Sequence, residues 1–204
     1  MISDLDETIK KLLTRDLPIK NGEVEISFET PNREWAAGRV KPAINLYLYQ
    51  IAENLKLRQT DWKVEKNDGQ ATKRRPPKRI NVTYMITAWA GDVEDEHRLL
   101  WRTLAVLSKH HTLPDDLLQG DLKDAEVAIK ATFPPEDEIL NPTDLWNVLS
   151  NDIRPAIHYR VVLPLDVFRR FTGPLVLKKI IKVEQGLEGK GPFEEIVQEG
   201  KKKE

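Results

Sequence analysis

Glu94 and His97 are the two side chains whose types and spacing come nearest to a metal site. Three residues apart on a helix, a carboxylate and an imidazole lie on the same face, as they do in bundle proteins that bind two metal ions. Such a site requires a second pair of the same kind, and the sequence offers none. A solvated pair on the surface of a helix explains these two residues without a ligand.

Acidic residues gather around this pair, at Asp92, Glu94, Asp95 and Glu96. Two carboxylates can act as general acid and base, so an unrecognised hydrolase that uses Glu94, Glu96 and His97 is one interpretation. The positive end of a helix dipole, however, attracts acids to the first turn of any helix. The position of the cluster is therefore explained without catalysis.

Common catalytic and nucleotide-binding motifs are missing from the sequence. It contains no phosphate-binding GxxxxGK[ST] loop, no dinucleotide-binding GxGxxG, no zinc-binding HExxH, no nucleophilic GxSxG and no EF-hand loop. Because it has no Cys, thiolate chemistry, disulfides and cysteine-based zinc sites are excluded as well. We predict a protein that is not an enzyme, with no catalytic residue, no cofactor and no metal.

The segment KRRPPKR at residues 73–79 departs most from an ordinary surface. Its two prolines stiffen a run of cations, which suits an acidic protein surface or a phosphate backbone. A solvated loop that leads into a strand is an equally good interpretation. A nucleic-acid-binding module is therefore an alternative function, although no aromatic or glycine pattern of such a module accompanies the run. The basic residues are Lys73, Arg74, Arg75, Lys78 and Arg79.

The tryptophans divide into two groups by their position in the sequence. Trp89, Trp101 and Trp146 lie in periodic segments and are expected in the core. Trp35 and Trp62 lie in polar segments that we interpret as loops, where a large aromatic side chain favours an interface. These two residues join the basic segment as candidates for partner binding.

Alternating and helical patterns predict the elements that position these residues. The clearest strand is 79–89, and we also expect strands at 23–29, 43–51, 126–131, 156–165 and 175–183. Helices are expected from Ser3 as N-cap, from Gly91-Asp92 to residues 109–111, after Pro114, and from Thr143-Asp144. The strands do not alternate strictly with helices. The fold class is therefore α+β, with a mixed, largely antiparallel central sheet flanked by helices.

Within this fold we expect Tyr84, Ile86 and Trp101 to be buried between the sheet and the helix at 91–111. Residues 53–78 turn polar and contain an Asn67-Asp68-Gly69 turn, so we expect a long loop that is mobile over about residues 66–79. Residues 1–185 form the predicted single domain, and residues 186–204 a flexible charged tail.

Charge and hydropathy place limits on the partners. Lys and Arg number 32 against 33 Asp and Glu, so no net field favours nucleic acid or a membrane surface. No stretch has the roughly 18 apolar residues of a spanning helix, and the first residues do not resemble an export signal. We expect no membrane insertion, no nucleic acid, and a cytoplasmic protein.

Four stretches of the sequence carry short motifs in a fixed order. They are residues 44–59, 75–92, 96–118 and 144–161, and the first ends near Arg58. The motifs are LY followed by N and R, RPP followed by YxxTAW, EHxLL followed by LP, and LW followed by YxV. This ordered set resembles the cap or tail-terminator family of phage-tail-like contractile injection systems.

The resemblance implies a tail-terminator-like fold and a subunit of a homohexameric ring. That ring would close the distal end of the inner tube, contact the sheath protein of the last ring, and become part of the injection particle. Its closed, heterologous interfaces would stop polymerisation by shape. The candidates for partner contact are Trp35, Arg58, Trp62, Lys73, Arg74, Arg75, Lys78 and Arg79.

Overall fold

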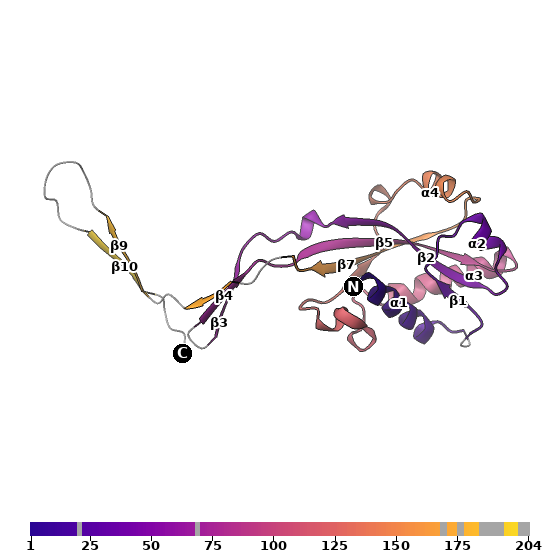
Figure 1. The fold of residues 1–204 in the computed structure, drawn as a ribbon. Coiled ribbons are helices and arrows are strands. Elements are labelled where there is room, and N and C mark those ends of the chain that lie inside the picture. The colour runs from indigo at the N-terminus through magenta and orange to yellow at the C-terminus, as the bar shows by residue number, and fades with distance from the viewer. Residues whose placement is uncertain (20–21, 68–69, 168–170, 175–177, 184–193, 200–204) are drawn as a thin grey trace. The chain divides into compact units, whose positions relative to one another are not determined.

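The computed structural model describes residues 1–19, 22–67, 70–167, 171–174, 178–183 and 194–199 (Figure 1). Its contacts divide the chain into two compact units. The sheet unit comprises Met1–Arg58 and Pro77–Asp166, and the hairpin unit comprises Gln59–Pro76 and Val167–Glu204. Most of the predicted tail at 186–204 lies outside the described residues, so the boundary at residue 185 stays a prediction.

The sheet unit is built on five strands in the order β1-β2-β5-β7-β6. Their bounds are β1 Glu25–Ser27, β2 Ala43–Glu53, β5 Lys78–Trp89, β6 Lys130–Thr132 and β7 Ile157–Leu165. Only β1 and β2 run parallel, and the other three pairs are antiparallel. The predicted α+β class with a mixed, largely antiparallel sheet is confirmed.

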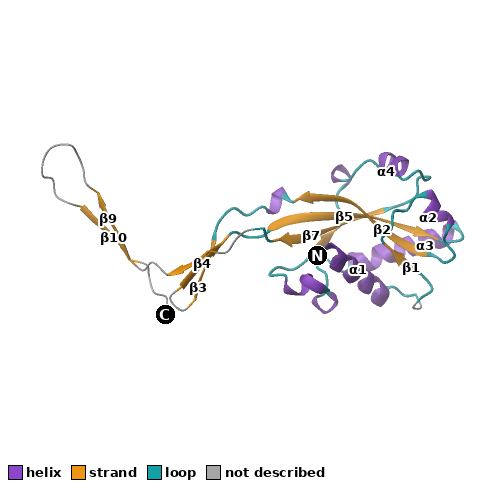
Figure 2. Cartoon of the chain, viewed as in Figure 1, coloured by secondary structure: helices purple, strands orange, loops and turns teal. Residues whose placement is uncertain are grey.

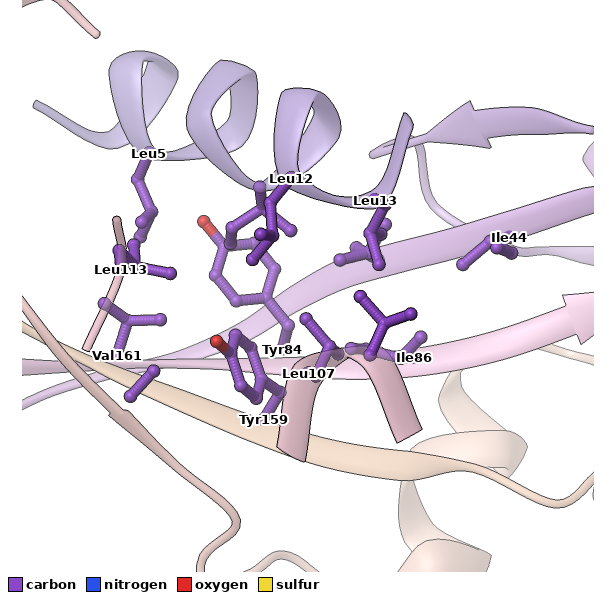
Figure 3. Close-up of a cluster of buried hydrophobic side chains, with 14 of the residues drawn as sticks. Leu5, Leu12, Leu13, Ile44, Tyr84, Ile86, Leu107, Leu113, Tyr159 and Val161 are labelled. Carbon is purple, nitrogen blue, oxygen red and sulfur yellow. The ribbon is translucent and has the colours of Figure 1, made fainter. Parts of the chain in front are cut away.

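Helices α1 (Ile2–Asp16) and α3 (Val93–Ser108) cover one face of this sheet (Figure 2). The apolar positions of α1 recur at helical spacing, so a single stripe faces the strands. Figure 3 shows its leucines pointing toward the strands, with Leu12 beside Tyr84 of β5. The Tyr84 hydroxyl donates a hydrogen bond to Asp6 Oδ1 at 2.6 Å. Tyr84 and Ile86 are fully buried, which confirms two of the three expected core residues.

The opposite face carries α2 (Arg33–Ala37) and α4 (Pro142–Val148). Trp146 of α4 is buried against Met85 and Trp89 of the sheet. These helices are short, and Figure 1 shows α4 on the side of the sheet away from α1 and α3. On this face Tyr47 and Tyr49 of β2 are only partly buried.

Four 3₁₀ turns connect the strands of the sheet unit. Their bounds are η1 Leu55–Leu57, η2 Asp115–Leu117, η3 Gly120–Asp124 and η4 Glu136–Glu138. Of the predicted strand at 126–131, only the end forms part of β6. The backbone just before β6 hydrogen-bonds outside the sheet, since Leu113 N–H donates to Ile129 O at 2.9 Å. The expected start of α3 is confirmed, since Asp92 caps it by accepting from Asp95 N–H at 2.8 Å.

The expectation that Trp101 is a core residue is wrong, because its side chain is 71% exposed. Leu99, Thr103, Val106 and Leu107 form the buried face of α3. Trp101 lies about 200° around the helix from Leu99, so it points away from the sheet. Ser3 is likewise not an N-cap, since α1 begins one residue earlier, at Ile2.

The hairpin unit corrects the prediction of a loop at 53–78. Two of its strands, β3 (Lys63–Asn67) and β4 (Gln70–Arg74), pair in antiparallel fashion on either side of the predicted turn, and β8 (Phe171–Pro174) adds to β4. A separate antiparallel pair joins β9 (Lys178–Val183) to β10 (Glu194–Glu199). These strands form by backbone pairing despite their charged composition. The loop was predicted from polarity alone, which does not report on backbone pairing.

Candidate interaction surfaces

The end of the sheet where β2 stops and β5 starts holds two of the predicted basic residues. Arg58 Nε donates to Glu53 Oε1 at 3.0 Å, and Lys78 Nζ approaches Glu53 Oε2 at 3.4 Å. The hydrogen bond from Arg58, followed by that from Lys78, lowers the pKa of Glu53. Both cations therefore share one carboxylate and stay partly exposed, at 52% and 41%.

Exposed apolar side chains surround this ion pair. Ile51 is 56% exposed, Leu55 65% and Leu57 43%. Asn54 fixes the turn by accepting a hydrogen bond from Leu57 N–H at 3.0 Å. We call Ile51, Leu55, Leu57, Arg58 and Lys78 the end-of-sheet surface. Its mixture of apolar and cationic groups is typical of a protein-binding surface.

Glu138 anchors the turn η4 beside this end of the sheet. Its carboxylate pairs with Lys56, at 2.8 Å, and with the nearly buried guanidinium of Arg160 in β7. Lys56 first, and then Arg160, lowers the pKa of Glu138 by hydrogen bonding to the charged form. Arg160 is thereby satisfied inside the fold, and we assign it a structural role.

In the hairpin unit, Trp62 meets two cations of the basic segment. Lys73 Nζ lies 4.9 Å from the centre of the indole, and Arg75 Cζ lies 5.1 Å from it. Both distances suit cation–π attraction. The Trp62 side chain is 38% exposed. Arg74, which lies between Lys73 and Arg75 in the sequence, is half-buried. Trp62, Lys73 and Arg75 form what we call the Trp62 cluster.

Trp35 and Arg79 belong to the sheet unit. Trp35 belongs to α2 instead of a loop, and its indole N–H donates to Glu29 Oε2 at 2.8 Å. Its ring meets Trp89 edge-on at 5.3 Å, so it anchors α2 to the sheet. Arg79 is half-buried in β5, where it faces Pro164. Partner contact by the eight candidates stays a prediction.

The sequence did not reveal two exposed apolar features of the sheet unit. One is Trp101 on α3. The other is a recess of about 270 Å3 between β2 and α4, where Val148 is 84% and Leu140 is 45% exposed. A strict helical projection from Leu99 would have identified Trp101. No comparable signal marks the recess, since it depends on how α4 lies on the sheet.

The acids considered for catalysis are engaged in ion pairs. Glu94 and Asp95 pair with Arg98, while Glu96 accepts from Arg154 at 2.6 Å and from the Ala90 N–H. Within the described residues, no group of three or more His, Asp or Glu side chains is arranged to hold a metal ion. Also within that part of the chain, no helix combines the length and apolar character needed to cross a membrane.

Comparisons with known proteins give one family match and similar solved structures. Residues 4–178 match the family profile described as Pvc16 N-terminal domain. The fold is similar to a PVC sheath/tube terminator of an extracellular contractile injection system, solved in its extended state, with a TM-score of 0.63 and 21% identity. It is also similar to the tube-terminating cap of the anti-feeding prophage, with a TM-score of 0.58 and 22% identity.

The two solved structures are longer than this chain. The first match covers 94% of this chain and 64% of the terminator, and the second covers 81% and 55%. The chain therefore spans less than two thirds of each matched protein. No curated protein sequence matches it. The tail-terminator-like fold expected from the sequence is confirmed by these matches.

Proposed function

Because the chain belongs to the Pvc16 N-terminal domain family, we propose that it is a structural terminator of a contractile injection system. The observation that carries this proposal is the family match over residues 4–178, together with a fold shared with a sheath/tube terminator over 94% of the chain. The protein would act by binding and shape, without an enzymatic reaction.

The proposed assembly is a homohexameric ring at the distal end of the inner tube. A tube of six-fold symmetry offers six equivalent contacts, and a closed ring of heterologous interfaces meets them without offering a further copy of the tube's end. The ring would contact the inner tube protein and the sheath protein of the last ring. Assembly would take place in the cytoplasm, after which the ring is part of the particle.

Two surfaces support binding to these partners. The end-of-sheet surface presents the exposed side chains of Ile51, Leu55 and Leu57 together with two cations, and the Trp62 cluster presents an indole in contact with two further cations. Aromatic and Arg side chains are the types that dominate binding energy at protein interfaces. An acidic protein surface is the partner chemistry that both surfaces suit.

Particle length tests the proposal. In cells that produce the particle, deletion of this gene should leave tubes and sheaths of variable length, because nothing ends their growth. Re-expression of the chain should restore a narrow distribution. Deletion that leaves the length distribution and the tube ends unchanged would refute a terminator role.

A further inference from the structure

Trp101 is a large apolar side chain on a surface that gives it no partner. It is 71% exposed on α3, and within the described residues no hydrogen bond reaches its indole N–H. His97 and Ala105, one turn away on each side, are exposed as well. A tryptophan exposed in this way is the residue type that contributes most at protein interfaces.

The recess between β2 and α4 has the complementary character. Its volume is about 270 Å3, and its walls are mainly aromatic and aliphatic. Asp144 lies in the lining and can accept a hydrogen bond; within the described part of the chain its carboxylate has no ion pair. The remaining lining residues are Tyr47, Tyr49, Leu140, Leu145, Val148 and Leu149.

The charges beside Trp101 and in the recess are also complementary. Arg102, next to Trp101, is exposed and has no ion pair within the described residues, while Arg98 is half-exposed one turn before it. The recess has the carboxylate of Asp144 in its lining. Arg98 is already paired with Glu94 and Asp95, so the unpaired cation beside Trp101 is Arg102. Contact between Arg102 and Asp144 would bring opposite charges together, which favours the contact of the tryptophan with the recess.

The two features lie on opposite faces of one sheet. α3 packs on the face that α1 covers, and α4 packs on the other face (Figure 1). One copy therefore cannot place its own Trp101 in its own recess. A two-fold dimer would not join the two features through a single contact. Its symmetry either places each feature against the same feature of the other copy or requires two contacts between Trp101 and the recess to form at the same time. Head-to-tail association of copies brings tryptophan and recess together.

We infer that Trp101 of one copy inserts into the recess of the next copy, with Arg102 and the indole N–H directed at Asp144. Repetition of this heterologous contact produces a closed ring or an open chain, according to the rotation that it imposes. The closed ring rests on the terminator function proposed above. The contact itself is a property of the sheet unit and holds without that function.

Sedimentation of the full chain over a range of concentrations tests the contact. The wild-type protein should self-associate, and Trp101→Ser and Val148→Arg should each weaken association by about 30-fold, as the loss of an interface hot spot does. Both positions are highly exposed, so melting temperatures should stay at the wild-type value. Val40→Ser, at a residue that is 97% exposed elsewhere, is the matched control and should associate normally.

A mixture of the two variants gives the sharper result. Trp101→Ser retains the recess and Val148→Arg retains the tryptophan, so one intact junction can form between one copy of each. At a protein concentration above the wild-type dissociation constant and well below that of the variants, the equimolar mixture should contain dimers, while each variant alone is mainly monomeric. A mixture no heavier than its components, a monomeric wild type, or a Trp101→Ser variant that associates like wild type would overturn the inference.

The length of particles separates this inference from the terminator function. If Trp101→Ser self-associates normally and particle lengths are restored by the wild-type chain, only the contact is wrong. If the contact behaves as expected but deletion leaves lengths unchanged, only the function is wrong. Loss of length control by Trp101→Ser with normal self-association would assign Trp101 to a tube or sheath partner and overturn the contact between copies.

Discussion

Tyr49 and His158 form a polar pair on the partly covered face of the sheet. Tyr49 Oη lies 3.0 Å from His158 Nδ1, and the two rings meet edge-on at 5.5 Å. Burial lowers the pKa of His158 below its ordinary value of 6.5, because the charged imidazole is disfavoured there. The neutral ring can accept a hydrogen bond from the Tyr49 hydroxyl at Nδ1, whereas the protonated ring cannot.

This pair makes stability depend on pH. The unfolded chain binds a proton at His158 more readily than the folded protein does, so the free energy of unfolding should fall as pH drops through 6.5 and level off below the folded pKa. In His158→Gln this part of the pH dependence should disappear. Urea unfolding of both proteins above and below pH 6.5 measures it. Identical pH slopes for the two proteins would contradict the assignment.

At the scale of elements, α4 ends in a Schellman motif with a serine at its left-handed position. Ser150 has a φ of 52°, its N–H donates to Asn147 O at 3.1 Å, and Asn151 N–H donates to Trp146 O at 3.3 Å. Glycine is the usual residue there, since a Cβ is strained at positive φ. The end of α4 therefore carries strain that a single substitution can remove.

Ser150→Gly should stabilise the protein by about 1 kcal/mol, because the left-handed backbone is no longer strained. Ser150→Ala retains a Cβ and should give no gain, which makes it the control. Chemical denaturation of the three proteins provides the comparison. A glycine variant no more stable than the alanine variant would show that the serine is not strained.

The two faces of the sheet unit give tryptophans opposite roles. Trp146 is 2% exposed beneath α4, whereas Trp101 is 71% exposed on α3. Trp146→Ala should cost about 3–5 kcal/mol, as truncation of buried aromatic residues does. Trp101→Ala should cost less than about 0.5 kcal/mol in the monomer. Thermal unfolding at low protein concentration measures the stability of both variants. A large loss of stability for Trp101→Ala would show that Trp101 is a core residue.

Elements with strong periodicity were predictable, and those that depend on pairing were not. The alternation in residues 79–89 and the acid-capped start at Asp92 correspond to β5 and α3. The strands β3 and β4 were not predicted, because backbone hydrogen bonds pair them and their charged side chains give no sign of that pairing. The partner-binding candidates were chosen by residue type. The structure adds how they group, with Lys73 and Arg75 on Trp62 and with Arg58 and Lys78 on Glu53.

At the scale of the whole molecule, the ordered set of short motifs was sufficient to identify the family. The chain belongs to the Pvc16 N-terminal domain family over residues 4–178, and its fold is similar to those of a sheath/tube terminator and a tube-terminating cap of contractile injection systems. The recess could not be predicted, because it depends on which face of the sheet α4 covers. The exposure of Trp101 could have been predicted from its helical position relative to Leu99. Function in this protein is therefore expected to reside in surfaces instead of motifs.

The Trp62 cluster should make binding to the particle sensitive to salt. Replacing Lys73 and Arg75 with Ser removes two cations from an exposed aromatic, so association with an acidic partner should weaken most at low ionic strength. The difference from the wild type should shrink as ionic strength rises, because salt screens the attraction that the variant lacks. The control, Lys10→Ser with Lys123→Ser, removes the same charge from exposed positions elsewhere. Counts of particles bearing each variant at low and high salt measure the effect. Equal counts for both variants at every salt concentration would contradict it.

The position of the chain in the particle tests the central claim most directly. The protein has no Cys, so Val40→Cys, at a residue that is 97% exposed, offers a single site for a maleimide-linked gold particle. Electron microscopy of purified particles that incorporate the labelled chain should show gold at one end of the tube only, with none along the sheath. Gold distributed along the particle, at both ends, or absent from intact particles would contradict a terminator.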